Sequence, residues 1–339
     1  MSRTIIIAEA GVNHNGDINI AKRLIDAAAE AGADYVKFQT FKANKVVSKE
    51  AKKADYQTKN TKNSDNQYDM LKRLELDEES HHVLIKYCEK KGIKFFSTAF
   101  DLDSIDFLHN IGIRLAKIPS GEITNYPYLK KIAQLFPEVI LSTGMSNLDE
   151  INQAVDILLK FGLQRGNLTV LHCNTEYPTP MLNVNLKAML TIKEKLKVSI
   201  GYSDHTLGIE VPIAAVAMGA EIIEKHFTLD RNLIGPDHKA SLEPNELRDM
   251  VNAIRNIEQA ISGNGIKVAS SSEKKNLHIA RKSIHLCRDL KKGDLITEND
   301  IIALRPGDGI CTFNWEKVLG KNIKSDSKTF TKLTWEDIL

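Results

Sequence analysis

Short apolar stretches alternate with longer amphipathic ones up to about residue 260 of the chain. The amphipathic stretches, such as 18–33 and 147–162, carry apolar residues three or four positions apart and end near a glycine, which is typical of helices. Eight strand–helix repeats predict an α/β fold with a TIM (β/α)8 barrel, and a doubly wound open sheet is the alternative. The predicted strands are residues 4–11, 35–39, 94–100, 114–120, 138–144, 168–174, 197–205 and 221–227.

Polar side chains stand where each of the eight predicted strands ends. In a barrel all eight carboxyl ends meet on one face, which is the face that holds the active site. A single polar exit would mean little because polar residues also cap helices, but eight of them favour an active site. They are Glu9, Asn13 and His14; Lys37 and Gln39; Ser97 and Thr98; Lys117, Ser120 and Glu122; Ser142 and Thr143; His172 and Asn174; Ser203, Asp204 and His205; and His226.

A long polar stretch, residues 41–77, interrupts the alternation after the second strand. It is either a solvated loop or a lid over an anionic substrate, since insertions after barrel strands lie on the catalytic face. We favour the lid, and the stretch carries several lysines. These lysines are Lys42, Lys45, Lys49, Lys52, Lys53, Lys59 and Lys62.

The pattern changes again beyond the helix that ends near residue 261. Residues 263–280 are rich in Gly, Ser and Lys and predict a linker. Short strands and turns follow in residues 281–339, a domain small enough to need support from another surface. We therefore expect a catalytic barrel over residues 1–262, a linker over 263–280 and a small β-rich domain over 281–339.

Composition narrows the class of protein. The 339 residues include 46 Lys and Arg and 44 Asp and Glu, a balance that gives no case for binding nucleic acid. The four cysteines form no CxxC pair, so we expect reduced thiols in a cytoplasmic protein. The first apolar run is too short for a signal peptide, and charges or turns interrupt the later runs, so no membrane association is expected.

Two histidines follow neighbouring strands, His205 after the seventh and His226 after the eighth. With a nearby acid they could bind a divalent metal, or they could be hydrogen-bonded structural residues, and spacing alone does not decide between the two. A third clear His or Cys ligand is missing from the pattern. A metal here would therefore occupy an open site completed by water or substrate oxygens.

Lys37 and Lys117 each stand alone among apolar strand residues. A buried lysine requires an anion, or it could form a Schiff base with a carbonyl substrate. The serines and threonines at the strand ends favour a cradle for a phosphate and a carboxylate. Glu9 and Glu122 are candidate proton-transfer groups, or simply ion-pair partners of the lysines.

Nucleotide-binding and hydrolase motifs are missing from the sequence. It contains no GxGxxG after a strand, no GxxxxGK[ST] and no GxSxG. The residues alone thus predict a metal-assisted barrel enzyme that acts on an anionic, phosphorylated substrate.

Several stretches together resemble one family. They are "AEAGVNHNG", "VKFQTFKA", "KIPSGE", "ILSTGM", "LHCNTEYPTP", "YSDHTLG" and "EKHFTLDRNLIGPDHKASLEP". In this order they resemble the sialic acid synthases, and "RKSIHL" with "LRPGDGI" is similar to that family's C-terminal, antifreeze-like (SAF) domain.

The resemblance implies a reaction in which phosphoenolpyruvate condenses with N-acetylmannosamine to give N-acetylneuraminate and phosphate. By resemblance, Mn²⁺ or Mg²⁺ is held by His205 and His226, and Glu9, Lys117 and Glu122 are the catalytic candidates. The resemblance assigns sugar binding to Tyr177, Asp237 and Arg305. It assigns phosphoenolpyruvate binding to Lys37, Thr98, Lys117, Ser120, Ser142, Thr175 and Ser203.

Arg305 matches an arginine of the family's small domain, which covers the barrel of a partner subunit. The resemblance therefore implies a domain-swapped homodimer in which Arg305 reaches the N-acetyl group in trans. The family's "RPGNG" is "RPGDG" here, so Asp308 adds a negative charge that could orient Arg305 or weaken its contact with the sugar.

Three alternatives stay open. The first is a synthase of legionaminic or pseudaminic acid that uses a 2,4-diacetamido-2,4,6-trideoxyhexose; the stretch 172–180 favours N-acetylmannosamine instead. The second is a metal-dependent barrel hydrolase, although "VNHNG" lacks the HxH that such enzymes carry after the first strand. The third is a carbohydrate- or ice-binding module led by the C-terminal domain, which the polar strand exits argue against.

Overall fold

Eight parallel strands form the core of the first part of the chain in the computed structural model, which describes residues 3–61 and 65–339. They follow one another around the sheet in the order β3-β2-β1-β8-β7-β6-β5-β4. This confirms the predicted (β/α)8 barrel rather than the open sheet. The strands are β1 (Ile5–Gly11), β2 (Tyr35–Thr40), β3 (Lys94–Ala99), β4 (Leu115–Ile118), β5 (Glu138–Ser142), β6 (Leu168–Cys173), β7 (Ser199–Asp204) and β8 (Ile222–His226).

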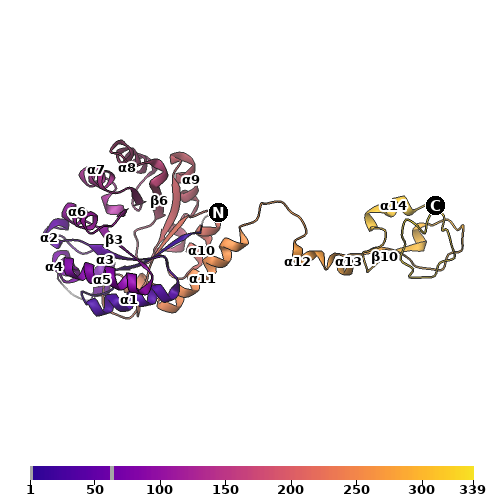
Figure 1. Cartoon of the computed structure of the whole chain (residues 1–339), viewed down its shortest axis with the longest axis horizontal. Coiled ribbons are helices and arrows are strands. Elements are labelled where there is room, and N and C mark those ends of the chain that lie inside the picture. Colours follow the sequence, from indigo (N-terminus) through magenta and orange to yellow (C-terminus); the bar gives the residue numbers. More distant parts are fainter. Residues whose placement is uncertain (1–2, 62–64) are drawn as a thin grey trace. The chain divides into compact units, whose positions relative to one another are not determined.

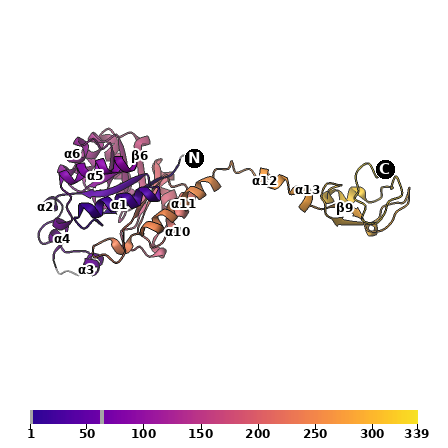
Figure 2. The same cartoon turned by 60° about the horizontal axis from the view of Figure 1, so that its bottom comes forward.

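Helices surround these strands, as Figures 1 and 2 show from two directions. Their apolar faces and the outer faces of the strands make one large buried core. Local signals set the helix ends: Asp17 caps the first helix, and Gly32 ends it in the left-handed conformation. The helices are α1 (Ile18–Ala31), α5 (Glu78–Lys91), α6 (Leu102–Asn110), α7 (Tyr126–Leu135), α8 (Leu148–Lys160), α9 (Lys187–Leu196), α10 (Glu210–Ala217) and α11 (Pro244–Ala260).

A buried tyrosine joins the two end strands of the sheet, β3 and β4. The hydroxyl of Tyr128 donates to Ala99 O at 2.7 Å and lies 3.5 Å from Lys117 O. Within the described chain no backbone ladder joins these two strands. The phenol therefore links the strands across the seam of the barrel.

Two layers of side chains fill the barrel interior. The floor is apolar and buried, and it consists of Ile7, Phe96, Ile140, Leu171 and Ile222. Because side chains alternate along a strand, the residues two positions further on also face inward, and these are polar in most strands. The floor thus carries a polar layer at the carboxyl ends of the strands.

Gly201 allows this floor to close. A Cβ atom at this position would lie 2.3 Å from Ile222 O and 2.5 Å from Leu171 Cδ2. Contacts that short do not occur between packed atoms, so any side chain here would push β7 away from its neighbours.

The chain divides into two units, Met1–Ser262 and Gly263–Leu339, and the second has its own apolar core. Strands β9 (Ser283–Leu286) and β10 (Ile301–Leu304) pair antiparallel there, followed by α14 (Trp315–Val318). The segment expected to be a linker holds two short helices, α12 (Ser271–Lys274) and α13 (Leu277–Ala280). The backbone N–H of Gly307 donates to His278 O, which binds the end of this segment to the small domain.

None of the described helices has both the length and the apolar character needed to cross a membrane.

Candidate active site

A cavity of about 320 Å³ opens at the carboxyl ends of the barrel strands. Of the residues to which the resemblance assigns a role, Glu122 is not part of its wall, and Arg305 belongs to the second unit of the chain. The residues that the structure brings together are Glu9, Lys37, Thr98, Lys117, Ser120, Ser142, Thr175, Tyr177, Ser203, His205, His226 and Asp237.

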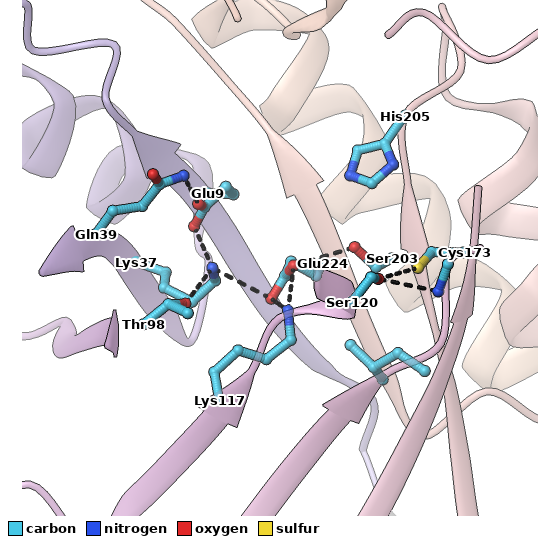
Figure 3. Close-up of polar contacts among 12 residues, drawn as sticks. Glu9, Lys37, Gln39, Thr98, Lys117, Ser120, Cys173, Ser203, His205 and Glu224 are labelled. Carbon is cyan, nitrogen blue, oxygen red and sulfur yellow. Dashed lines mark hydrogen bonds and ion pairs between the residues drawn. The ribbon is translucent and has the colours of Figure 1, made fainter. Parts of the chain in front are cut away.

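Four buried charged side chains form the base of the cavity (Figure 3). Lys37 Nζ lies 2.8 Å from Glu9 Oε2 and 3.6 Å from Glu224 Oε2. Lys117 Nζ donates to both carboxylate oxygens of Glu224, at 2.8 and 3.0 Å. Glu224 is thus the shared partner of both lysines, and Glu9 contacts only Lys37 within this group of four.

The two glutamates respond differently to this environment. Burial raises the pKa of the Glu9 carboxyl to about 7, although Lys37 opposes the shift. Burial also acts on Glu224, but Lys117 and Lys37 outweigh it and hold the pKa of that carboxyl well below its usual value. Near neutral pH Glu9 can therefore gain or lose a proton, whereas Glu224 stays ionised.

The two lysines differ as well. Burial alone would lower the pKa of the Lys37 ammonium, but Glu224 and Glu9 raise it above its ordinary value. Burial lowers the pKa of Lys117, and Glu224 offsets this only in part. With Glu9 protonated and both lysines charged, the cluster is net positive and suits an anionic ligand.

Hydroxyl groups complete the cradle around these charges. Thr98 Oγ1 accepts from Lys37 Nζ at 2.9 Å, and Ser203 Oγ donates to Glu224 Oε1 at 3.0 Å. Ser142 Oγ is buried in the wall and has no hydrogen-bond partner among the described residues. A buried donor of this kind is available to an oxyanion that enters the cavity.

A close backbone approach places Ser120 in the wall. The N–H of Gly144 donates to Ser120 Oγ at 2.9 Å, and Cys173 Sγ lies 3.3 Å from the same oxygen. A Cβ atom on residue 144 would come within 2.5 Å of Thr175 Cγ2. Glycine at this position therefore lets the loops after β5 and β6 meet.

His205 and His226 lie side by side at the rim of the charged cluster, with ring centroids 5.4 Å apart. Burial lowers the pKa of His205 to about 4 and holds that of His226 well below its ordinary value. Both imidazoles are therefore neutral at physiological pH, which is the form that binds metal ions.

The surroundings of the ring nitrogens also suit both histidines as metal ligands. His205 Nδ1 lies 2.5 Å from Asn174 O, so this nitrogen carries the proton and Nε2 keeps its lone pair. Nδ1 of His226 is buried and has no partner within the described ranges. Those ranges contain no group of three or more His, Cys, Asp and Glu side chains suited to a metal. The two histidines thus fit an open site with two protein ligands.

Tyr177 packs over both imidazoles. Its ring centroid lies 4.1 Å from that of His205 and 5.7 Å from that of His226. Asp237 stands in the same wall, 7% exposed, and burial raises the pKa of its carboxyl to about 6. Both residues therefore face the part of the cavity above the charged cluster.

The polar stretch after β2 borders the cavity, but with apolar and aromatic side chains rather than lysines. It folds into α2 (Ala43–Val46), α3 (Asp55–Thr61) and α4 (Gln67–Leu74). Lys42, Lys45, Lys49, Lys52 and Lys59 are exposed, Lys53 pairs with Asp65, and Lys62 lies outside the described residues. The wall instead receives Phe41, Val46, Tyr56, Gln57, Gln67, Met70, Leu71 and Leu74. The described lysines of this stretch are not part of the wall.

The resemblance also assigns roles to Glu122 and Arg305. Glu122, in the short 3-10 turn Ser120–Glu122, accepts a hydrogen bond from the Asn125 side chain at 2.5 Å and lies outside the cavity wall. Arg305 belongs to the second unit, where its Nε donates to Ala280 O at 2.8 Å. Asp308 forms an ion pair with Lys332 at 2.8 Å.

Glu224 is the functional residue that the sequence analysis missed. A signal for it exists, because Ile222, Glu224 and His226 alternate along one strand and so share the inward face. A glutamate two positions before a candidate ligand, on a buried strand, requires a positive partner.

Two family models and several known proteins match the chain. The model of the NeuB family matches residues 24–267, and that of the SAF domain matches residues 281–339. The chain is 55% identical to N,N'-diacetyllegionaminic acid synthase of Campylobacter jejuni over 96% of its own length and 98% of that protein's length. It is 48% identical to the enzyme of the same name from Legionella pneumophila, over 98% and 94% of the two lengths. Among solved structures, N-acetylneuraminic acid synthetase of Leptospira borgpetersenii superposes with a TM-score of 0.70 and 37% identity, covering 81% of this chain and 90% of that one.

Proposed function

Because the chain belongs to the NeuB family, we propose that it is an N,N'-diacetyllegionaminic acid synthase. It would condense phosphoenolpyruvate with a 2,4-diacetamido-2,4,6-trideoxyhexose and release inorganic phosphate. The observation that carries the proposal is the buried cluster of Glu9, Lys37, Lys117 and Glu224 in a cavity that also holds two neutral histidines.

Phosphoenolpyruvate carries a phosphate and a carboxylate, and the base of the cavity offers donors for both. Lys37 and Lys117 supply the positive charge, and Glu224 holds the two ammonium groups in place before the substrate arrives. Neutral donors complete the site in this proposal, and they are Thr98, Ser120, Ser142, Thr175 and Ser203.

The reaction forms one C–C bond, and at C2 it replaces the C–O bond to phosphate by a C–O bond to the oxygen of water. The C3 carbon of phosphoenolpyruvate attacks the open-chain aldehyde of the sugar, and the aldehyde oxygen takes up a proton. Water then adds at C2 and gives up a proton. Phosphate leaves when its C–O bond to C2 breaks, which generates the keto group of the product.

Glu9 is the residue we assign to proton transfer. Its carboxyl has a pKa near 7, so it can hold a proton for the aldehyde oxygen or take one from the attacking water. Gln39 Nε2 lies 3.4 Å from Glu9 Oε1 and, together with Lys37, orients the carboxyl.

A divalent ion, Mn²⁺ or Mg²⁺, belongs to this proposal, with His205 and His226 as its protein ligands. When bound there, it supplies Lewis-acid polarisation of the aldehyde carbonyl. Tyr177 and Asp237 lie next to the histidines and are the proposed contacts of the sugar.

Two observations favour the diacetamido sugar over N-acetylmannosamine, which the sequence analysis preferred. The two relatives of 55% and 48% identity are both diacetyllegionaminic acid synthases. The segment after β2 also contributes apolar side chains to the cavity wall, among them Phe41, Met70 and Leu74. An apolar wall suits a C6 methyl group and acetamido methyls better than a C6 hydroxyl.

The test is phosphate release by the purified full-length protein from phosphoenolpyruvate. We would compare N-acetylmannosamine with the diacetamido sugars that give legionaminic-type and pseudaminic-type products, with Mn²⁺, with Mg²⁺ and with a chelator. We expect kcat/KM to be about tenfold or more higher with the legionaminic-type sugar, since one added apolar contact is worth about that factor. A preference for N-acetylmannosamine would overturn the choice of sugar, and no release with any sugar would overturn the enzyme proposal.

A further inference from the structure

A second buried ion pair lies at the ends of β7 and β8, and the proposed reaction does not use it. Lys225 Nζ lies 2.5 Å from Asp204 Oδ2, and both side chains are 0% exposed. Neither residue is part of the cavity wall, whereas their neighbours Ser203, His205, Glu224 and His226 are. Because side chains alternate along a strand, the pair lies on the outer face of the barrel, behind the two histidines.

A closed set of hydrogen bonds extends this pair to the residue that follows His205. Lys225 Nζ also donates to Thr206 O at 2.5 Å. Asp204 accepts from Thr206 N at 3.1 Å and from Thr206 Oγ1 at 3.0 Å. The chain is therefore fixed on both sides of His205 and directly before His226.

The backbone explains why such a link matters at this point. The β7–β8 ladder ends with Asp204 opposite Lys225, and His226 pairs with Glu9 of β1 instead. The ion pair is thus the last described register position that joins the two strands before the histidines project into the cavity.

Stability alone does not explain the pair. Removing two charges from water is expensive, and an apolar pair of similar volume is often as stable as a buried ion pair or more so. A buried pair can instead fix one geometry among several, because its hydrogen bonds are directional.

We propose that Asp204 and Lys225 are positioning residues that hold His205 and His226 at the spacing with which they bind one divalent cation. The inference rests on the metal site of the proposed function. It adds two residues on the outer face of the strands to the determinants of that site.

The test measures Mn²⁺ affinity directly, from the electron paramagnetic resonance signal of free Mn²⁺ over the full-length protein without substrate. In the double variant Asp204→Leu/Lys225→Met, both charges are replaced by apolar groups of similar size. We expect its Kd for Mn²⁺ to rise about 10- to 100-fold, as for other outer residues that orient metal ligands. The matched control is Asp34→Leu/Arg255→Met, which removes a 3.0 Å ion pair joining α11 to the loop before β2 and should leave the Kd unchanged.

Circular dichroism and thermal unfolding show whether the double variant folds. If it folds and binds Mn²⁺ like the parent protein, the proposal is overturned. If it does not fold, Thr206→Val decides, because it keeps both charges and removes only the hydroxyl bond to Asp204. We expect a several-fold higher Kd for that variant, and an unchanged Kd would overturn the proposal.

His226→Ala separates this inference from the proposed function. If His226→Ala loses Mn²⁺ and the apolar double variant does not, only the positioning role fails. If His226→Ala binds Mn²⁺ as tightly as the parent protein, the metal is not at the histidines, and both the metal site and the positioning role fail.

Discussion

Glu224 contacts both buried lysines of the cavity. Its carboxylate contacts two lysine ammonium groups and accepts a hydrogen bond from a serine hydroxyl, so both of its oxygens have partners before any ligand binds. Its carboxylate keeps two ammonium groups buried close together, where they would otherwise repel each other. The substrate anion therefore meets lysines that are already desolvated and oriented.

Replacing Glu224 tests this role. Glu224→Gln leaves two buried ammonium groups without their shared anion, and we expect the free energy of unfolding to fall by about 3–5 kcal/mol. Phosphoenolpyruvate supplies the missing negative charge, so its addition should raise the melting temperature of the variant more than that of the parent protein. Glu122→Gln is the matched control, because Glu122 lies outside the cavity wall. Equal stabilisation of parent and variant by phosphoenolpyruvate would contradict this role.

The raised pKa of Asp237 predicts that the free energy of unfolding depends on pH. Burial raises the pKa of its carboxyl from 3.8 to about 6, so the folded state binds more protons than the unfolded state between these values. Stability therefore falls as the pH rises from about 4 to about 6. Since one pKa unit corresponds to about 1.4 kcal/mol, the ionised group costs about 3 kcal/mol above pH 6.

Asp237→Asn removes this charge. In urea denaturation without ligands, the variant should be up to about 3 kcal/mol more stable than the parent protein at pH 7.5 and nearly equal to it at pH 4. The exposed Asp249→Asn is the control and should change neither value. A difference of the same size at both pH values would show that ionisation is not its cause.

At the scale of single residues, the sequence predicts which side chains lie at the ends of the strands. It does not predict the direction of a side chain that lies in a turn beyond its strand. Lys37, Lys117 and the two histidines reach the cavity as expected, because the strand directions determine their positions. Glu122 follows a strand as well, yet a 3-10 turn directs it to Asn125. Strand alternation alone would have identified Glu224.

The polar segment after β2 borders the cavity with other side chains than its lysine-rich composition suggests. The segment is rich in lysine, but Lys45 on α2 and Lys59 on α3 are exposed, and the segment buries apolar side chains instead. Phe41, Met70 and Leu74 pack there against Val12. The sequence predicts the segment because it interrupts the alternation of strands and helices. Which of its side chains face inward depends on packing against Val12 in the β1–α1 loop, which is far away in sequence.

Helix α3 has no buried residue, so its position depends on a few contacts with the barrel. Tyr56 stacks on Tyr177 with ring centroids 5.2 Å apart, and Asn60 Nδ2 donates to Pro236 O at 2.8 Å. Because Tyr177 in turn packs on His205, a single aromatic stack joins the lid to the proposed metal site.

Tyr56→Ala should therefore impair sugar binding more than phosphoenolpyruvate binding. An aromatic pair contributes about 0.5–1.5 kcal/mol beyond its buried area, so we expect the KM for the sugar to rise about three- to tenfold. The KM for phosphoenolpyruvate should stay within about twofold, and Tyr56→Phe should restore the parent values. Tyr68→Ala, in the same segment but outside the cavity wall, is the control. Equal increases in both KM values would mean that the stack does not act on the sugar.

At the scale of the whole molecule, the sequence predicts two domains because the strand–helix rhythm stops before residue 281. It does not by itself specify an assembly, since the residues that would contact a partner look like ordinary exposed ones. Arg305 is such a residue, exposed on the small domain and bonded to Ala280 O. The family resemblance alone implies that it acts on a partner's barrel.

Mixed dimers test this implication. We would co-express Arg305→Ala and His226→Ala chains with different tags and purify the dimer that carries both. If Arg305 acts in trans, one barrel of this dimer has its own His226 and the partner's intact arginine. About half of the parent kcat per dimer should then return with a normal KM for the sugar, as expected for one intact site in a two-fold assembly.

The Arg305→Ala homodimer should keep a raised sugar KM, and the His226→Ala homodimer should release no phosphate. If the mixed dimer also keeps the raised KM, the only working histidine pair depends on position 305 of its own chain, which carries alanine. The small domain would then complete the site in cis, and an exchange of domains between subunits would not be needed for activity.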